Sequence, residues 1–464
     1  MRNIINAVAL LPFFAILLFS STSFSEEKPY INIGRAEIKQ SPMALVPLIY
    51  LGTESIAANK LAYGKRFYDI IEKDLTISSY FSFISPEAFV EDYKSRSLTP
   101  KENDPAQGFD FSSWKQIGAE FMIRSGFKVV NNQFQYDAYL YHVPKRKLIM
   151  GKSYSGSVND LRTIAHKFCN DIMESLTGKQ GFFMTKFLVS RGTTKAEKEI
   201  FIMDWDGASQ KQISTHRTIS QSPSWSPNGR YLTYTSFLYH KRLKTRNADL
   251  FLYDMKTEKR WLLSYQKGIN SGGAFTPDSS EVLLRISKTG SSDIYKTDLE
   301  GKKLIQLTDG PRGAMNVEPA VSPDGRTVAF SSDRSGKPMI YTMNMSGGDV
   351  KRLTFAGVYN SSPAWSPDGQ RLAFAGFDKG HFDIFTIDAN GKSIKRLTSA
   401  QKRDGRPANN EYPSFSPDGR FILFSSDRTG RYQLYIVSID GKYEHRLTFD
   451  NKDYYKPQWS PYLQ

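Results

Sequence analysis

Residues 322–336 read SPDGRTVAFSSDRSG, and versions of this phrase recur six times between Lys186 and Gln464. The phrase consists of a small or aromatic residue, Ser/Thr-Pro, a turn and an alternating apolar run. Strand-like units with a period in the forties are typical of a β-propeller, in which each repeat forms one four-stranded blade. By subtraction, the residues before the Ser/Thr-Pro pair are 50, 46, 44, 50 and 44 positions apart: Trp225, Phe275, Val321, Trp365, Phe415 and Trp459.

The turn inside the phrase is a second signal for paired strands. It reads Pro-Asn-Gly or Pro-Asp-Gly at residues 227–229, 323–325, 367–369 and 417–419, and Pro-Asp-Ser at 277–279. Proline presets φ and glycine accepts a positive φ, so the chain reverses tightly between two strands. An aspartate at this place is expected to cap its own turn rather than to bind a metal.

The two ends of the repeat region complement each other. The first unit lacks its Ser-Pro strand, and the last Ser-Pro strand, Pro457–Pro461, has no unit after it. We expect the C-terminus to complete the first blade, because closing the ring removes two exposed sheet edges. The sequence therefore predicts an all-β six-bladed propeller over residues 181–464, closed by the C-terminal strand.

Residues 26–180 have a different pattern, which predicts a small α/β domain. One helix is indicated by apolar spacing on a single face: Leu61, Gly64, Tyr68, Ile71 and Leu75. The other expected elements are strands at 43–50, 121–125, 127–130 and 134–140, and a helix over about 160–176 that ends before Gly178.

The first 25 residues predict a signal peptide. Arg2 supplies the positive charge, residues 4–19 are mostly apolar, and Ser23-Phe24-Ser25 places small residues where a signal peptidase cuts. The apolar run is short for a membrane span and contains Pro12. We therefore expect an exported chain that is cleaved near Ser25.

The single cysteine and the net charge limit the kinds of partner and chemistry. Cys169 shares a predicted helical face with Ala165 and Ile172, which indicates a buried structural thiol. The formal net charge is +15, but the basic residues are scattered, and the one dense run, residues 241–246, is expected in a loop within a blade. No nucleic-acid partner is therefore expected.

Residues that could support catalysis do not form a recognisable set. The six histidines never stand at metal-ligand spacing, and residues 151–155, Gly-Lys-Ser-Tyr-Ser, lack the final glycine of a nucleophile elbow. Hydrolases of the prolyl-oligopeptidase type add an α/β-hydrolase domain to a propeller, for which this chain has no room. We predict that the protein is not an enzyme and has no cofactor, and no motif supports a divalent cation in the channel.

These features together resemble the TolB family of the Tol–Pal system, over essentially the whole mature chain. The resemblance is carried by MALVPL at 43–48, IAHK at 164–167, LTGKQGFF at 176–183, and PQWSPYL at 457–463. The repeated Trp-Ser-Pro-Asp-Gly and Arg-Leu-Thr phrases add to it. It implies a non-enzymatic periplasmic scaffold that supports outer-membrane constriction at cell division and envelope integrity, and we expect a monomer.

The same resemblance implies two protein partners. The peptidoglycan-associated lipoprotein Pal would bind the propeller mouth, and the inner-membrane protein TolA would bind the mature N-terminal segment, which suits an added strand. That segment comprises Glu26, Glu27, Lys28, Pro29, Tyr30, Ile31, Asn32, Ile33 and Gly34. The repeat register independently predicts one rim of the channel, formed by the residues before each Ser-Pro strand: Gln221, Asn270, Ser271, Val317, Glu318, Asn360, Ser361, Asn410, Glu411 and Tyr455.

The sequence also permits a second interpretation of the protein's function. An exported propeller could instead bind a glycan, a peptide or an ion in its channel, or act as the regulatory module of an exported hydrolase. Recovery of a Pal-like lipoprotein from envelope extract would favour the scaffold, and hydrolysis of ester or peptide substrates would favour the alternative.

Overall fold

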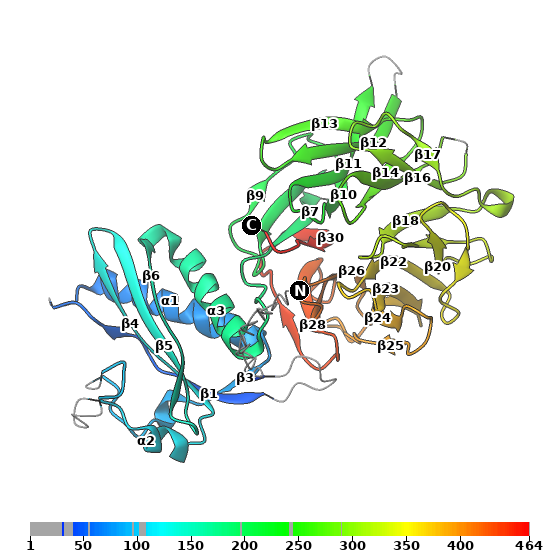
Figure 1. The fold of residues 1–464 in the computed structure, drawn as a ribbon. Helices are drawn as coiled ribbons and strands as arrows, with labels where there is room; N and C mark the ends of the chain where they lie inside the picture. Colours follow the sequence, from blue (N-terminus) through cyan, green and yellow to red (C-terminus); the bar gives the residue numbers. More distant parts are fainter. Residues whose placement is uncertain are drawn as a thin grey trace, which may run out of the picture.

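The computed structural model describes residues 30–31, 40–53, 56–94, 97–101, 108–194, 197–240, 245–288 and 290–463. Within these residues a mixed sheet with helices comes first, and a ring of six four-stranded sheets follows (Figure 1). The predicted fold class, an α/β domain before an all-β six-bladed propeller, is confirmed. The predicted signal peptide lies outside the described residues. No described helix has the length and apolar character needed to cross a membrane.

The first domain is built on a six-stranded mixed sheet. Its elements are β1 (Ser41–Leu45), β2 (Ile49–Tyr50), α1 (Ala58–Ile77), β3 (Phe81–Phe83), η1 (Pro86–Ala88), α2 (Phe111–Gln116), β4 (Phe121–Val130), β5 (Gln133–His142), β6 (Lys147–Ser157), η2 (Val158–Asp160) and α3 (Leu161–Thr177). The strand order is β3-β1-β4-β5-β6, with β2 paired to β4. β1 runs parallel to β3 and β4, while β4, β5 and β6 are antiparallel. α1 and α3 pack on one face of the sheet, and α2 covers the other.

Three details of the first domain differ from the sequence prediction. The predicted strand 43–50 is divided into β1 and β2 at Pro47, because proline has no N–H for the ladder. The two predicted strands 121–125 and 127–130 form one strand, β4, that continues through Gly126. In α1 the buried face includes Phe67, whereas Leu61 is 51% exposed.

The second helix agrees with its prediction. α3 ends at Thr177, and Gly178 follows with a φ of 70° and donates its N–H to the carbonyl of Glu174. Cys169 is buried on this helix, as predicted.

Each propeller blade is an antiparallel sheet whose first strand lies nearest the central channel. We number the blades I (β30-β7-β8-β9), II (β10–β13), III (β14–β17), IV (β18–β21), V (β22–β25) and VI (β26–β29). The strand bounds are β7 (Lys186–Thr194), β8 (Glu197–Asp204), β9 (Lys211–Gln212), β10 (Ser220–Trp225), β11 (Tyr231–His240), β12 (Thr245–Asp254), β13 (Lys259–Ser264), β14 (Asn270–Phe275), β15 (Glu281–Ile286), β16 (Asp293–Asp298), β17 (Ile305–Gln306), β18 (Asn316–Val321), β19 (Thr327–Ser332), β20 (Met339–Asn344), β21 (Lys351–Arg352), β22 (Tyr359–Trp365), β23 (Arg371–Asp378), β24 (His381–Asp388), β25 (Lys395–Arg396), β26 (Asn410–Phe415), β27 (Phe421–Ser426), β28 (Gln433–Ser438), β29 (Glu444–Arg446) and β30 (Asp453–Trp459). A short 3-10 helix, η3 (Pro311–Gly313), precedes β18. The innermost strands β30, β10, β14, β18, β22 and β26 contact their neighbours right round the ring.

The turns after the innermost strands adopt the geometry that their sequence predicts. Gly325 has a φ of 70°, and Ser279 takes a φ of 62° in the one copy without glycine. Asp324 accepts hydrogen bonds from the Ser322 hydroxyl (2.5 Å) and the Arg326 N–H (3.1 Å). The aspartate therefore caps its own turn.

The C-terminal strand closes the ring, as the repeat pattern predicts. β30 pairs antiparallel with β7, with Trp459 opposite Phe187, and Figure 1 shows the red β30 beside the green β7. The Trp459 indole N–H donates to the Thr185 hydroxyl at 2.8 Å. Its ring packs edge-on against Phe182 and Phe187, with centroids 5.4 and 5.0 Å away. The first and last strands of the propeller thus share one blade.

The first domain contacts the propeller at the end where the Ser-Pro turns lie. Arg162 of α3 makes two hydrogen bonds of 2.7 Å to the carboxylate of Asp206, in the turn after β8. Lys73 of α1 lies 3.8 Å from the same carboxylate. The guanidinium of Arg420 stacks over the Tyr80 ring at 3.5 Å from its centroid. These contacts lie at the turn end of the channel, opposite the end at which the innermost strands begin.

Candidate functional site

A cavity of about 650 Å³ occupies the centre of the propeller. Prolines such as Pro319 and Pro363 and aromatic residues such as Trp225 and Trp365 line it, and all six innermost strands contribute. An apolar cavity with a few polar groups is the usual form of a binding site. We call the end at which the innermost strands begin the mouth.

Three successive positions of each innermost strand form three rings at the mouth. The buried ring consists of Ser220, Asn270, Asn316, Asn360, Asn410 and Tyr454. The rim ring consists of Gln221, Ser271, Val317, Ser361, Glu411 and Tyr455, all partly exposed. The mouth ring consists of Ser222, Gly272, Glu318, Ser362, Tyr412 and Lys456, which are partly exposed and line the cavity.

A β-bulge at the same register in every innermost strand produces the mouth ring. In all six blades the pairing with the second strand shifts just after the rim-ring residue. The mouth-ring residues take φ values between 47° and 68°, although five of the six are not glycine. Non-glycine residues in this left-handed region are strained, and such strain concentrates at functional sites. The bulge turns these residues out of the ladder and into the cavity wall.

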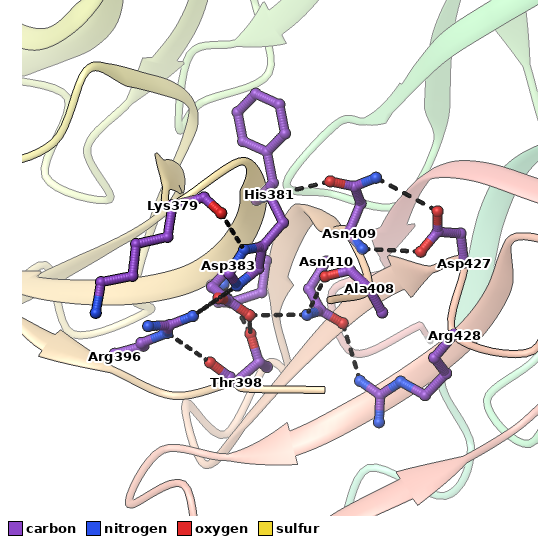
Figure 2. Close-up of polar contacts among 12 residues, drawn as sticks. Lys379, His381, Asp383, Arg396, Thr398, Ala408, Asn409, Asn410, Asp427 and Arg428 are labelled. Carbon is purple, nitrogen blue, oxygen red and sulfur yellow. Dashed lines mark hydrogen bonds and ion pairs between the residues drawn. The ribbon is translucent and has the colours of Figure 1, made fainter. Parts of the chain in front are cut away.

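The asparagines of the buried ring join one blade to the next. The side-chain amide of Asn410 donates to Asp383 at 2.8 Å, and its oxygen accepts from Arg428 at 2.9 Å (Figure 2). The Thr398 hydroxyl donates to the same Asp383 carboxylate at 2.8 Å. Asp383 and Thr398 belong to blade V, whereas Asn410 begins blade VI. The network therefore fixes the backbone on which the rim and mouth rings stand.

The predicted site residues Asn270, Asn360 and Asn410 all belong to this buried ring. They are between 0 and 2% exposed. The Asn270 amide donates to the Ala248 carbonyl at 2.9 Å, and the Asn360 amide donates to the Thr354 hydroxyl at 3.0 Å. Because a buried amide must satisfy its hydrogen bonds internally, these three side chains fix the backbone of the rim in this structure.

Side chains of the mouth ring connect adjacent blades. The Glu318 carboxylate accepts hydrogen bonds from the Ser362 backbone N–H at 2.7 Å and from the Ser362 hydroxyl at 3.2 Å. At the other side of the ring, the Lys456 ammonium donates to the Ser222 hydroxyl at 3.0 Å and lies 5.3 Å from the centre of the Tyr412 ring. Blade IV is thus linked to blade V through a carboxylate, and blade I is linked to blade II through an ammonium group.

The rim ring adds a second acidic group, Glu411, and a lysine outside the ring contacts its residue Tyr455. Burial raises the pKa of Glu411, and the hydrogen bond of 2.7 Å from the Tyr432 hydroxyl opposes this rise. The Lys198 ammonium lies 3.5 Å from the centre of the Tyr455 ring, a cation–π contact. Among the residues of the rim and mouth rings, the acidic groups come from blades IV and VI, and the basic group, Lys456, comes from blade I.

The sequence prediction and the cavity wall overlap at one residue. Of the ten predicted rim residues, Glu318 lines the cavity and three belong to the buried ring. The other six make up the rim ring: Gln221, Ser271, Val317, Ser361, Glu411 and Tyr455. Sequence reasoning missed the other mouth-ring residues, Ser222, Gly272, Ser362, Tyr412 and Lys456. The available signal was their position directly before proline or glycine in every copy. Contact of the ten residues with a partner stays a prediction.

The predicted N-terminal segment is described only at Tyr30 and Ile31. The Ile31 N–H donates to the Leu176 carbonyl at 2.9 Å. The Tyr30 ring packs against Phe121 at 6.2 Å and His142 at 5.3 Å between centroids. The remaining residues of the segment, 26–29 and 32–34, lie outside the described residues.

The thiol and the hydroxyl that could act as nucleophiles have structural roles among the described residues. Burial raises the pKa of the Cys169 thiol, and the neighbouring Asp74 adds to this effect, so the nucleophilic thiolate is disfavoured. Ser153, in the sequence that approaches a nucleophile elbow, lies inside strand β6 and donates to Asp137 at 2.5 Å. In the part of the chain that the structure describes, no group of three His, Cys, Asp or Glu side chains could hold a metal ion.

The fold and the site together define a two-domain β-propeller protein with a polar channel mouth at one end and an α/β domain at the other. A family model described as the TolB beta propeller domain matches residues 173–463, and one described as the TolB amino-terminal domain matches residues 29–149. The chain belongs to the TolB family.

Individual relatives agree with this assignment. The chain is 31% identical to the Tol-Pal system protein TolB of Desulfosudis oleivorans, over 63% of each protein. It is 30% identical to a TolB homolog of Chlorobium luteolum, over 75% of this chain and 74% of that protein. The crystal structure of TolB from Acinetobacter baumannii superposes with a TM-score of 0.74 at 26% identity, covering 91% of this chain and 97% of that one. The matches span 63% of the Desulfosudis protein and 47% of a relative from Syntrophotalea carbinolica.

Proposed function

We propose that this chain is a non-enzymatic, exported scaffold of the Tol–Pal system. It binds the Pal lipoprotein at the mouth of the propeller and TolA through its mature N-terminal segment, residues 26–34. In this role it supports constriction of the outer membrane at cell division and the integrity of the envelope. It works in the periplasm as a monomer and needs no cofactor.

The mouth ring is the observation that carries the proposal. Six partly exposed residues, five of them strained non-glycine residues, stand at one register, on a backbone fixed by buried asparagines. A rigid surface of this kind lowers the entropic cost of binding a partner. The first domain contacts the propeller at the other end, at Asp206 and Arg420, and so leaves the approach to the mouth to a partner.

Charge reversal at the mouth should weaken Pal binding. Glu318→Lys removes the carboxylate that Ser362 and Ser331 bind at 2.7 and 3.2 Å and reverses the charge of the cavity wall. We expect the affinity to fall at least about tenfold, because the lysine cannot accept these hydrogen bonds and the backbone that shapes the mouth loses its fixed geometry. The measurement is titration calorimetry with the soluble domain of the Pal-like lipoprotein from the same cell.

The matched control is Glu300→Lys, the same change at an exposed turn of blade III at the opposite end of the channel. Its affinity should equal that of the unmodified protein. Glu318→Gln, which keeps the shape of the side chain, should show a smaller loss than Glu318→Lys. Equal affinities for all four proteins would place the lipoprotein elsewhere, and a lack of binding by the unmodified protein would refute the proposed function.

The N-terminal partner site is supported by the character of its described residues. Tyr30 and Ile31 pack on the first domain while being only partly buried. A partner that takes residues 26–34 as an added strand has to replace the Ile31 hydrogen bond to Leu176. The non-enzymatic part of the proposal is supported by the raised pKa of Cys169 and by the position of Ser153 within a strand.

A further inference from the structure

Two serines of the mouth ring have the same backbone geometry but different neighbours. Ser362 and Ser222 have φ values of 53° and 55°, at the same step of the bulge. At Ser362 on blade V, the preceding blade IV supplies the carboxylate of Glu318. At Ser222 the preceding blade supplies the ammonium group of Lys456. The two serines therefore share one backbone conformation, but the neighbouring side chain is negatively charged at Ser362 and positively charged at Ser222.

Glu318 shows what this backbone geometry binds. Its carboxylate accepts from the N–H and from the hydroxyl of Ser362 at 2.7 and 3.2 Å. A backbone N–H paired with a hydroxyl is a suitable donor pair for a carboxylate, since charge-assisted hydrogen bonds are the strong ones. Ser362 is thus occupied by a carboxylate of the protein itself, whereas Ser222 offers the same donor pair beside a cation.

The wall next to Ser222 lacks a mouth-ring side chain on the blade III side. Blade III has Gly272-Gly273 where the other five blades have a side chain followed by proline. A Cβ at Gly272 would meet nothing nearer than the Pro319 ring at 4.0 Å. Gly273 keeps a backbone N–H that proline lacks. A ligand group at Ser222 therefore meets no mouth-ring side chain from blade III.

We propose that Ser222, Lys456 and Gly272 form a carboxylate-binding site, the Ser222 site, which takes an acidic side chain of the lipoprotein partner. The carboxylate accepts from the Ser222 N–H and hydroxyl and pairs with the Lys456 ammonium. Glu318 and Glu411 on blades IV and VI repel a second acidic group. The mouth therefore admits the partner in one orientation, with its acidic side toward blades I to III. This inference rests on the proposed function, because it names the chemistry of the same site.

Two serine substitutions, one in the site and one outside the mouth, test the site. Ser222→Ala removes the hydroxyl donor of the site, and the control Ser346→Ala removes a hydroxyl in the exposed turn between β20 and β21, at the other end of the channel. In titration calorimetry with the soluble lipoprotein, we expect Ser222→Ala to weaken binding about threefold or more and Ser346→Ala to leave it within twofold. Lys456→Gln should weaken it at least about tenfold, whereas Lys392→Gln, in the exposed turn between β24 and β25 at the other end of the channel, should not.

Zero-length carbodiimide coupling of the complex gives an independent readout, since it joins an amine only to a carboxylate in contact with it. The expected product links Lys456 to an aspartate or glutamate of the lipoprotein. The inference is overturned if the unmodified protein binds the lipoprotein but Lys456→Gln and Ser222→Ala bind equally well and Lys456 forms no link. Failure of the unmodified protein to bind would instead overturn the proposed function, and the Ser222 site with it.

Discussion

Replacement of Trp459 by alanine should lower the free energy of unfolding by about 3–5 kcal/mol, as other buried Trp→Ala and Phe→Ala changes do. Trp459 is 5% exposed, and its indole contacts Phe182, Phe187 and the Thr185 hydroxyl. The substitution removes this packing and the hydrogen bond that the Thr185 hydroxyl accepts, although this hydroxyl still donates to the Phe182 carbonyl at 2.6 Å. Because Trp459 joins the C-terminal strand to the first strand of the propeller, its loss also weakens the closure of the ring.

Urea unfolding followed by circular dichroism measures this change. The control is Phe355→Ala, since Phe355 is 72% exposed and its removal creates no cavity; its unfolding midpoint should not move. A Trp459→Ala protein as stable as the Phe355→Ala protein would contradict the view that β30 holds the ring together.

Substitution of Asp206 by asparagine should weaken the contact between the two domains by about 3 kcal/mol, the cost of breaking a largely buried ion pair. The Asp206 carboxylate accepts two hydrogen bonds of 2.7 Å from Arg162 and lies near Lys73. The asparagine keeps the shape of the side chain but removes its charge. Asp404→Asn, at a fully exposed pair with Arg406, is the matched control and should leave the stability unchanged.

The pH dependence of the Asp206→Asn effect has a definite sign. Burial acts to raise the pKa of Asp206, but the hydrogen bonds and charge of Arg162, with His166 and Lys73, outweigh it and hold the pKa below the usual value of 3.8. A lowered pKa in the folded state stabilises the fold above the unfolded value, and the stabilisation is lost as the pH falls through the folded value. The difference between the two proteins should therefore be complete at pH 7 and shrink below about pH 3.8. An unchanged difference at low pH would show that charge is not its source.

The repeat made most of the propeller predictable. The Ser/Thr-Pro phrase places one innermost strand per blade, and the unmatched Pro457–Pro461 copy predicts the closing strand. Both predictions depend on local chemistry that recurs: proline and glycine in the turns, and alternation in the strands. Six copies of one weak signal specify the architecture far better than any single copy would.

The site was less predictable, because its geometry depends on contacts between blades. The sequence pattern indicates polar residues before each Ser-Pro strand, but it does not tell a buried Asn410 from a partly exposed Glu411 one position later. That distinction comes from Asp383 and Arg428, which are distant in sequence. The bulge at Ser362 likewise has no strong local signal, because a positive φ is unusual for serine.

Amide hydrogen exchange of the protein with and without the soluble Pal-like lipoprotein tests the central claim most directly, since it maps the partner onto the backbone without substitutions. The account predicts slower exchange on binding in peptides that contain the rim and mouth rings, above all residues 218–222, 267–272, 314–318 and 452–456. Exchange at the turn end, residues 205–208 and 417–420, should not change. Protection confined to the turn end or to the first domain, with the mouth unaffected, would contradict the account.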